Sequence, residues 1–382
     1  MRINSRQDLS LAYTPGVADP CIEISKSPAK VYDYTMKGNT VAVITDGTAV
    51  LGLGDIGPEA SLPVMEGKSL LFKEFAGIDS FPLALRTKDV DEIVSIVKAI
   101  APVFGGINLE DISAPRCFEI EERLQGIGIP VMHDDQHGTT VVVYAALMNA
   151  LKVAGKGMRD IRVVVNGAGA AGASICRMLS CTGYDAGVCT GVKELIALDS
   201  KGIIHRGRAD LDRSKEALAS ITNPMNRSGT LSDALEGADV FIGVSRANVL
   251  TKDMVLSMAP GAIVFAMANP VPEIMPQDAL DAGAAVVGTG RSDFPNQINN
   301  VLAFPGIFRG ALDARASRIT PGMRMAAAIV LSGCVTAPAH DSILPSPLDR
   351  GVVKKIAEAV KSRAIAENVS RLPIEEKAQS KR

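Results

Sequence analysis

The sequence predicts an α/β protein built from two parallel-sheet units and a helical C-terminal segment. Three observations lead to this prediction. Short apolar runs alternate with amphipathic stretches from residue 41 onward, a glycine loop follows a β-branched run in mid-chain, and the pattern becomes wholly helical after residue 306. With 382 residues, 47% of them hydrophobic, the chain is long enough for two or three domains with sizeable cores.

The first unit is predicted from strand-length apolar runs separated by one helical pattern. The runs at 41–45, 81–85 and 129–132 have strand length, and residues 89–100 place apolar side chains at helical spacing. Residues 139–154 form a further helical run, which we interpret as the bridge to the next unit. We assign residues 1–137 to an N-terminal domain that carries substrate and metal groups.

The second unit is predicted to be a doubly wound, Rossmann-type nucleotide domain over residues 138–313. A strand at 161–165 leads through the glycine loop into a helix that ends near Cys181. Residues 314–382 form a helical segment with a last helix at 351–367. Further strands of the second unit are predicted at 195–198, 240–243, 262–266 and 284–287.

The glycine loop has the pattern, the preceding strand and the following helix that dinucleotide binding requires. The first glycine permits a tight turn, the second lets backbone N–H groups approach a pyrophosphate, and the third allows close packing of helix on strand. A turn used only for packing is the alternative. The predicted cofactor-binding residues of the loop are Gly167, Gly169, Ala170, Ala171 and Gly172.

A second GxGxxG pattern at 52–57 is not interpreted as a cofactor loop. It carries Asp55 where a pyrophosphate would have to lie, and Pro58 follows before a helical pattern can begin. We expect a structural or substrate-facing turn there.

The residues after the predicted strand at 195–198 leave the choice of dinucleotide open. Asp199 stands where an acidic residue accepts the ribose hydroxyls of NAD. However, Ser200 and the cations Lys201, Arg206, Arg208 and Lys215 follow closely, and cations there could neutralise the 2′-phosphate of NADP.

Adjacent carboxylates point to a divalent metal. Asp134 and Asp135 follow an apolar run, where they would repel each other unless a cation or hydrogen bonds stabilise them. If Glu110, Asp111 and Asp135 converge, they form an all-oxygen site that suits Mg²⁺ or Mn²⁺ and not zinc. The alternative for Glu110 and Asp111 is a solvated helix start. His133 and His137 could also be ligands, but structural histidines are the more common case.

Lys68 and Tyr13 (in the segment 11–18) are candidate proton-transfer groups. Lys68 lies among apolar residues in a helix-like stretch, so it is either snorkelling or functional. Buried beside a metal, its pKa would fall toward the working pH, and Asp134 could hold it. Tyr13 precedes a proline-glycine turn that could fix its hydroxyl in a cleft, although a packing tyrosine is the alternative.

Composition excludes several classes of function. A net charge of -2, with scattered Lys and Arg, indicates no nucleic-acid partner and no membrane surface. The N-terminus lacks the apolar core of a signal peptide, so we expect a cytoplasmic protein. The six cysteines include no CxxC pair, and we expect buried free thiols.

These motifs resemble those of the malic enzyme family in its short bacterial form. The resemblance implies oxidative decarboxylation of L-malate to pyruvate and CO2, with reduction of NAD or NADP, a divalent metal and a homodimer. Glu110, Asp111 and Asp135 then correspond to metal ligands, Lys68 to the general base, Asp134 to its carboxylate partner, and Tyr13 to the acid that protonates C3 of the enolate. The matching segments are 13–18, 41–57, 63–75, 104–118, 130–139, 166–172, 265–273 and 288–306.

The resemblance also implies substrate-binding amides and a lysine near the site: Asn269, Asn299, Asn300 and Lys30. By composition alone these asparagines are turn formers. Gln136 with His137, together with Ser200 and Lys215, resembles the variants that use NADP, so the resemblance favours NADP.

This chain departs from the larger members of the family at two places. Thr48, Ala49 and Val50 stand where those members carry a substrate-binding arginine before the GLG turn, so the partner of one malate carboxylate is not identified. The segment before Tyr13 is also shorter than in those members.

Two other functions remain possible from the residues alone. A metal-independent 2-hydroxyacid dehydrogenase would stop at the keto acid, and it typically uses a histidine base paired with an aspartate. A dinucleotide-binding sensor would not turn over at all. Both alternatives leave the cluster of Lys68 and acidic residues without a purpose.

Overall fold

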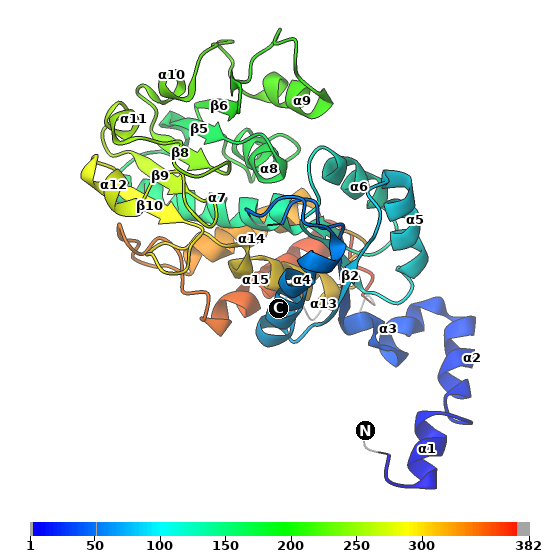
Figure 1. The fold of residues 1–382 in the computed structure, drawn as a ribbon. Helices are drawn as coiled ribbons and strands as arrows, with labels where there is room; N and C mark the ends of the chain where they lie inside the picture. Colours follow the sequence, from blue (N-terminus) through cyan, green and yellow to red (C-terminus); the bar gives the residue numbers. More distant parts are fainter. Residues whose placement is uncertain (1–2, 51, 373–382) are drawn as a thin grey trace.

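The computed structural model describes residues 3–50 and 52–372, which form two parallel-sheet units joined by one long helix (Figure 1). The predicted fold class, mixed α/β with a doubly wound domain, is confirmed. The predicted strands are found within a few residues of their expected positions. None of the helices in the described ranges is long and apolar enough to cross a bilayer.

The first sheet has four parallel strands in the order β2-β1-β3-β4. The elements of this unit are β1 (Thr40–Thr45), β2 (Asp79–Ala84), β3 (Gly106–Leu109), β4 (Val131–His133), α4 (Pro58–Ala76), α5 (Val90–Ile100) and α6 (Arg116–Leu124). β1 is buried along its whole length. Val41 and Val43 belong to the core on the α4 side, while Ala42 and Ile44 belong to the core formed with α5 and α6. Burial on both faces is typical of a parallel sheet.

The second sheet has six strands in the order β10-β9-β8-β5-β6-β7. Its elements are β5 (Arg162–Asn166), β6 (Glu194–Asp199), β7 (Gly202–Ile203), β8 (Val240–Gly243), β9 (Ile263–Ala266), β10 (Val286–Thr289), α8 (Ala170–Leu179), α9 (Arg213–Ile221), α10 (Leu231–Leu235), α11 (Lys252–Leu256) and α12 (Pro276–Asp281). Every neighbouring pair is parallel except β6 and β7. The strand order reverses between β5 and β8, where doubly wound folds bind their ligands.

A single buried helix connects the two units. α7 (Asp134–Ala154) begins directly after β4 and packs on α8 of the second unit. Most of its residues between 140 and 151 are buried, as expected for a helix that is apolar on all sides. The first residues of α7 therefore lie at the end of the first sheet, while its body belongs to the core of the second unit.

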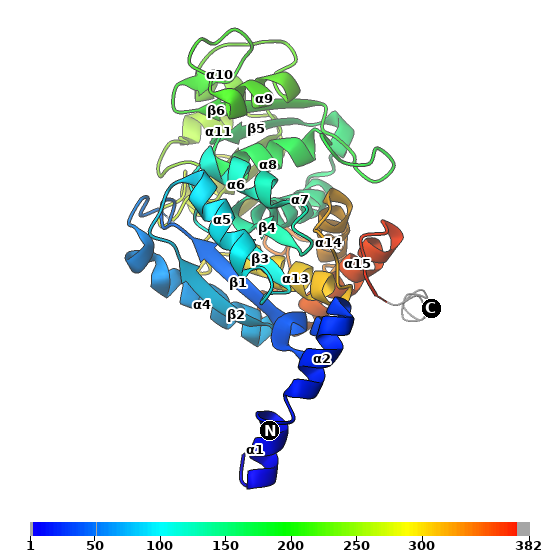
Figure 2. The same ribbon diagram turned by 90° about the vertical axis from the view of Figure 1, so that its right-hand side faces the viewer.

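The C-terminal helices complete the core between the units. α13 (Phe304–Asp313) packs on α4 and α15 (Arg350–Ala366), and α14 (Pro321–Gly333) packs on α7 and α15. The short helices η3 (Met158–Asp160) and η4 (Asn300–Leu302) lie in the connections before β5 and α13. Figure 2 shows α13, α14 and α15 beside the first sheet. α13, which the sequence assigned to the nucleotide domain, thus contacts the N-terminal unit.

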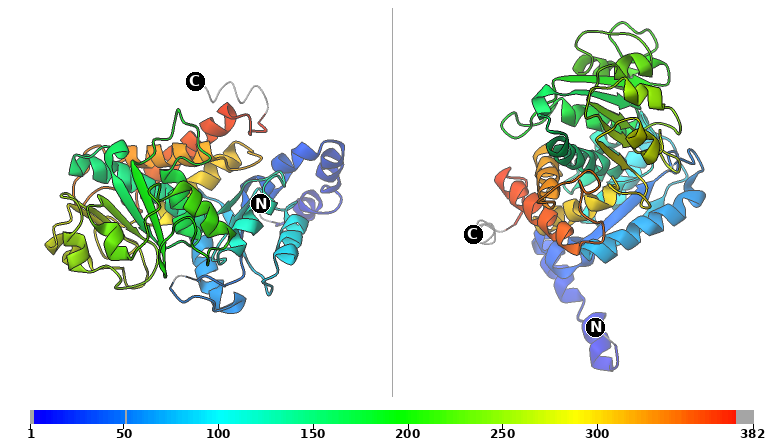
Figure 3. Two further views of the ribbon diagram at one scale, coloured as in Figure 1. Left: turned by 90° about the horizontal axis from the view of Figure 1, so that it is seen from above. Right: turned by 90° about the vertical axis from the view of Figure 1, so that its left-hand side faces the viewer.

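The N-terminal segment projects away from the rest of the molecule. It consists of α1 (Arg6–Ala12), α2 (Ala18–Lys26), η1 (Pro28–Lys30), α3 (Val31–Tyr34) and η2 (Met36–Asn39). Figures 2 and 3 show α1 and α2 extending beyond the body. We call residues 3–27 the N-terminal arm.

The expectation that all cysteines are free thiols is wrong for two of them. Cys181 and Cys189 form a disulfide with an S–S distance of 2.08 Å. Both lie in the loop between α8 and β6, with their Cα atoms 5.7 Å apart, within the range that a disulfide spans. Cys117 and Cys176 are free and buried, Cys334 is half-buried, and Cys21 is exposed.

Candidate active site

Acidic side chains from two connections meet at the carboxyl edge of the first sheet. Glu110 and Asp111 follow β3, and Asp135 lies in the first turn of α7, directly after β4. Parallel neighbouring strands end at the same edge, which explains why these connections converge. One oxygen from each of the three carboxylates lies within 4.8 Å of the others. The Asp111 backbone N–H donates to Asp135 Oδ2 at 2.8 Å, which fixes the two connections together.

Lys68 reaches this cluster from α4, and its side chain is almost completely buried. Its Nζ lies 2.7 Å from Asp134 Oδ2 and 2.9 Å from Glu110 Oε1. The Phe304 ring centroid lies 4.3 Å from the same nitrogen, so an aromatic face covers the amine. Asn108 donates to Glu110 Oε2 at 2.7 Å. We call Lys68, Glu110, Asp111, Asp134 and Asp135 the carboxylate–lysine cluster.

One glycine makes room for this arrangement. A Cβ on Gly138 would lie 1.8 Å from Asp134 Oδ1, so any side chain at this position would displace the carboxylate. Gly138 lies in the same helix, one turn after Asp134. The glycine within the run 133–139 thus has a packing reason that the sequence alone does not reveal.

Burial and unbalanced charge dominate the electrostatics of the cluster. Burial raises the pKa of Glu110, as does the charge of Asp135, and Lys68 opposes this shift. Burial likewise raises the pKa of Asp134. For Lys68, burial lowers the pKa, but Asp134, Glu110 and Asp135 outweigh it and raise the pKa above its usual range. The expectation that the pKa of Lys68 falls toward the working pH applies to a site that holds a metal, and it stays a prediction.

The donor set of the cluster fits a divalent metal ion. Glu110, Asp111 and Asp135 offer only oxygen ligands, the set that Mg²⁺ and Mn²⁺ prefer. One lysine cannot balance four carboxylates in a buried site, whereas a divalent cation would compensate most of their charge. The predicted ligands are thus brought together by the structure.

Two predicted site residues are not brought to the cluster within one chain. Tyr13 lies at the end of α1 in the N-terminal arm, and its side chain is 67% exposed. Lys30 lies in η1 and forms an ion pair with Glu23 of α2. Within one chain, neither residue lies at the cluster, because the arm leads away from the first sheet, and their assignment to the site stays a prediction.

The predicted substrate amides lie on the loops after β9 and β10. Asn300 lies in η4. A Cβ on Gly138 would lie 3.3 Å from the Cβ of Asn300 and 1.8 Å from Asp134 Oδ1, so Asn300 and Asp134 are neighbours on either side of this glycine. The side chain of Asn299 caps η4 by accepting the Val301 N–H. Asn269 precedes Pro270. A Cβ on Gly52 would lie 2.2 Å from the backbone oxygen of Asn269, so the two segments are in close contact. The turn at 52–57 therefore packs against a predicted substrate loop.

The glycine loop lines a separate cavity of about 850 Å³ at the carboxyl end of β5 and β6. A Cβ on Gly172 would lie 1.7 Å from the Gly167 carbonyl oxygen, so the helix approaches the loop too closely for any side chain. A Cβ on Gly169, in contrast, meets nothing within 4 Å, which leaves its backbone open to the cavity. Such a cradle at the N-terminus of α8 fits the pyrophosphate of a dinucleotide. Other lining residues include Asn166, Leu198, Asp199, Ser200, Lys201, Lys215, Ser245 and Asn248.

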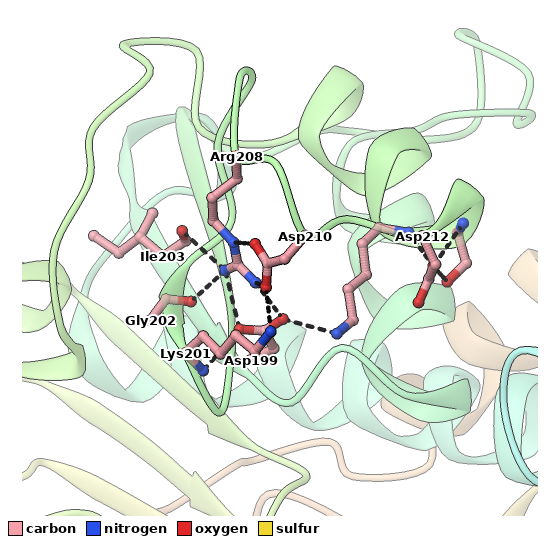
Figure 4. Close-up of polar contacts among 9 residues, drawn as sticks. Asp199, Lys201, Gly202, Ile203, Arg208, Asp210 and Asp212 are labelled. Atoms are coloured by element: carbon pink, nitrogen blue, oxygen red, sulfur yellow. Dashed lines mark hydrogen bonds and ion pairs between the residues drawn. The ribbon is translucent and has the colours of Figure 1, made fainter.

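Asp199 at the rim of this cavity is held by two cations (Figure 4). Arg208 donates to both of its oxygens, at 3.0 and 2.8 Å, and Lys215 donates to Oδ2 at 2.8 Å. The Lys201 backbone N–H donates a hydrogen bond to Asp199 Oδ1 at 2.9 Å. Burial alone would raise the pKa of Asp199, but the hydrogen bonds from Arg208 and Lys215 lower it to about 2. Its acceptor sites are thus largely filled by the chain itself. Arg208 also binds Asp210.

His137 points away from the carboxylate–lysine cluster. Its Nε2 lies 3.0 Å from Glu121 Oε2, and its Nδ1 contacts Ser174 and Arg324. Burial and the charge of Arg324 lower its pKa to about 4, against the opposing effect of Glu121. These residues line a cavity of about 1520 Å³ that none of the cluster residues lines. We therefore place the candidate site at the cluster and not in this larger cavity.

Sequence reasoning missed three contacts of the site. Phe304 begins a helix far from Lys68 in the sequence, and only the tertiary packing of α13 on α4 brings the two together. Arg208 was noted only as a nearby cation, although it is the main partner of Asp199. Arg116 of α6 reaches Asp46 Oδ2 at 2.7 Å and Thr48 Oγ1 at 2.9 Å, and so fixes the segment before the Gly52 turn. Non-local pairings of this kind leave no spacing pattern in the sequence.

Both units of the chain are similar to known proteins. Residues 136–370 match the family model described as malic enzyme, NAD binding domain, and residues 1–89 and 86–125 match malic enzyme, N-terminal domain. The chain is 56% identical to a bifunctional malic/malolactic enzyme of Bacillus subtilis, over 98% of this chain and 90% of that protein.

Two further relatives differ in the cofactor that they are named for. An NAD-dependent malic enzyme of Geobacillus stearothermophilus is 54% identical over 97% of this chain and 76% of its own length. An NADP-dependent malic enzyme of Rhizobium meliloti is 47% identical over 97% of this chain and 50% of its own length. Among solved structures, an NAD-dependent malic enzyme from Thermotoga maritima matches with a TM-score of 0.90 and 49% identity, covering 94% of each chain.

Proposed function

The chain belongs to the malic enzyme family, and we propose from this that it converts L-malate to pyruvate and CO2 while it reduces NAD or NADP. The observation that carries the proposal is the carboxylate–lysine cluster, in which a buried amine lies beside an all-oxygen metal-type site. The dinucleotide would bind in the cavity of the glycine loop.

Each residue of the carboxylate–lysine cluster has its own role in the proposed reaction. Lys68 takes the C2 hydroxyl proton of malate while the hydride leaves C2 for the nicotinamide. Asp134, 2.7 Å from Lys68 Nζ, orients the amine and shares its proton. Glu110, Asp111 and Asp135 would hold the metal. A divalent ion bound there would supply Lewis-acid polarisation of the C2 oxygen and would offset part of the carboxylate charge. Loss of CO2 leaves an enolate, and protonation of its C3 by an acid yields pyruvate.

Asn269, Asn299 and Asn300 are proposed to orient the substrate and the nicotinamide carboxamide. Asn300 and Asp134 both lie against Gly138, so Asn300 is near the proposed base Lys68 and its carboxylate partner. Asn269 lies at a turn that contacts the Gly52 turn. Amides at such positions can donate to a carboxylate or accept from an amide without adding charge to an already anionic site.

A direct assay tests the reaction. Reduced nicotinamide and CO2 are followed together with L-malate, Mn²⁺ and either dinucleotide, and then again after EDTA treatment. The proposal expects equal yields of both products, together with pyruvate, and loss of activity with EDTA. Reduced nicotinamide without CO2 would indicate a simple 2-hydroxyacid dehydrogenase, and neither product would favour a dinucleotide-binding sensor.

The name of the Bacillus subtilis relative raises a second candidate function, the malolactic reaction. In that reaction the reduced nicotinamide formed from malate would return its hydride to pyruvate at the same site. CO2 would then exceed reduced nicotinamide, and lactate would replace pyruvate. Identification of the organic product in the same assay distinguishes the two reactions.

The open space around the backbone of Gly169 leads to a separate prediction for cofactor binding. Gly169→Ala places a methyl group where the structure has nothing within 4 Å, so the protein should fold normally. The methyl group would, however, lie between the backbone N–H groups and the pyrophosphate, and we expect the Kd for the dinucleotide to rise about tenfold, the equivalent of about 1.4 kcal/mol. Fluorescence titration of the reduced dinucleotide measures this. Gly333→Ala, also in open space at the end of α14, is the control and should leave the Kd unchanged.

The cations around Asp199 lead to a prediction about the binding of the 2′-phosphate of NADP. We propose that Lys215 contacts the 2′-phosphate of NADP, since it lines the cavity and its side chain is 26% exposed. Lys215→Ala should then lower kcat/KM for NADP about tenfold, the size of one lost charge-assisted hydrogen bond, and change the value for NAD far less. Steady-state kinetics with both cofactors test this, with Lys252→Ala on α11 as a control. Equal losses for both cofactors would refute the assignment.

The oligomeric state and the cellular compartment are the last two parts of the proposal. We expect the chain to form a homodimer, as the resemblance implies, and to act in the cytoplasm. Sedimentation velocity measures the first directly.

A further inference from the structure

A buried carboxylate on α6 contacts the start of α7 and has no role in the reaction proposed above. Glu121 is only 9% exposed and shares the buried face of α6 with apolar side chains, where an acidic group is costly unless it is paired. Its Oε1 accepts the His133 backbone N–H at 3.0 Å, and its Oε2 lies 3.0 Å from His137 Nε2. Glu121 thus holds the chain on both sides of Asp134 and Asp135.

The contacts of His137 determine which of its ring nitrogens carries the hydrogen. Its Nδ1 faces the guanidinium group of Arg324, which can only donate, so Nδ1 is the acceptor. Nε2 then carries the hydrogen and donates it to Glu121. Ser174 of α8 also lies 3.2 Å from Nδ1. The contacts of Glu121 and His137 therefore join α6, α7, α8 and α14 at the first turn of α7.

The same turn carries opposing charges on its other side. Asp134 and Asp135 belong to the carboxylate–lysine cluster, whose four carboxylates repel one another before a cation binds. Within the cluster, Lys68 pairs with Asp134, and the Asp111 N–H donates to Asp135. Glu121 adds two hydrogen bonds from outside the cluster, so it can resist a displacement of the turn by this repulsion.

We propose that Glu121 is a positioning residue for the metal site. Through His133 and His137 it would hold the turn that carries Asp134 and Asp135 in the arrangement that a divalent ion requires. Ligands that are already held in place lose less freedom when the metal binds, and partners that support a metal ligand commonly affect its affinity. The inference rests on the proposed function in one respect, the metal site, and does not depend on decarboxylation.

Glu121→Gln tests this role, because it preserves the size of the side chain but replaces one acceptor with a donor. The new amide nitrogen cannot accept from His137, and a switch of the histidine to its other tautomer would set a hydrogen against Arg324. We expect the Kd for Mn²⁺ to rise about tenfold to a hundredfold, the usual range for loss of such a supporting partner. The EPR signal of the free ion measures this Kd without substrate.

The next residue of the same helix provides the matched control. Glu122 is exposed, so Glu122→Gln removes the same charge from the surface of α6. This variant should bind Mn²⁺ with the Kd of the wild type. Equal rises of the Kd in both variants would assign the effect to a loss of charge and overturn the positioning role.

A change at His137 separates position from charge more strictly. His137→Leu keeps the charge of Glu121 but removes one of its two contacts with α7. Positioning predicts weaker Mn²⁺ binding in this variant as well, and recovery in His137→Gln, whose amide can still donate to Glu121. An unchanged Kd in His137→Leu would contradict the proposal.

Folding and activity are measured beside the metal affinity. Urea unfolding in EDTA shows whether each variant folds, and if Glu121→Gln does not fold, the two variants of His137 decide. A folded Glu121→Gln protein with the wild-type Kd would overturn the role of Glu121. A wild type that binds no Mn²⁺ would overturn the metal site and this role with it. Normal Mn²⁺ binding without release of CO2 from malate would contradict only the proposed function.

Discussion

Lys68→Ala is expected to abolish malate oxidation, with kcat reduced about a thousandfold. Lys68 is the base proposed for the C2 hydroxyl, and its Nζ lies within 2.9 Å of two buried carboxylates. Removal of the amine also leaves Asp134 and Glu110 without their cation. In EDTA we therefore expect the free energy of unfolding to fall by about 3 kcal/mol, as for one partner lost from a buried ion pair. Steady-state kinetics and urea unfolding measure the two effects.

The matched control lies on the same helix. Lys73 pairs with Asp79 at 2.7 Å, but its side chain is 62% exposed. An exposed pair contributes at most about 1 kcal/mol, so Lys73→Ala should keep both its activity and its stability. If Lys68→Ala retained full activity, the base would have to be another group, and the assignment of the site would fail.

Asp135→Asn is expected to remove metal binding while it preserves the fold. The asparagine oxygen can still accept the Asp111 N–H that Asp135 Oδ2 now accepts at 2.8 Å. It contributes no charge, however, and a divalent ion held by three carboxylates loses one of them. We expect the wild type to gain thermal stability with increasing Mn²⁺, because a ligand that binds only the folded state stabilises it. The variant should show little gain, and kcat should fall at least a hundredfold.

A carboxylate outside the cluster is the control for this variant. Asp91→Asn on α5 removes an exposed charge that pairs with Arg123. Its Mn²⁺-dependent shift in Tm should match that of the wild type. An Asp135→Asn protein that still gained the full shift would place the metal elsewhere.

The sequence predicted the parts of the molecule that local patterns specify. Strand periodicity located both sheets, and the GxGxxG pattern with its flanking strand and helix located the loop that lines the cavity at the carboxyl end of β5 and β6. The convergence of Glu110, Asp111 and Asp135 was only a condition at that point, and the rule that parallel strands end at one edge explains why these residues meet. These features depend on residues that are close in the chain or on a general rule of topology.

Features that depend on tertiary packing could not be predicted in this way. The ion pairs of Lys68 with Asp134 and Glu110 depend on how α4 packs against two connections that lie far away in the sequence. The Cys181–Cys189 disulfide depends on the path of a loop. The position of Tyr13 depends on the anchors of α3, such as Asp33 with Arg315, which are far apart in the sequence. For Lys68 and Tyr13 the decisive contacts are non-local, and for the disulfide the conformation of the loop decides.

Anomalous scattering from a crystal grown with Mn²⁺ would test the central claim most directly. The account predicts a strong anomalous difference peak between Glu110, Asp111 and Asp135, within about 2.5 Å of an oxygen of each. Lys68 should remain beside the peak, in contact with Asp134. A peak at another group of residues, with this cluster free of metal at saturating Mn²⁺, would contradict the account.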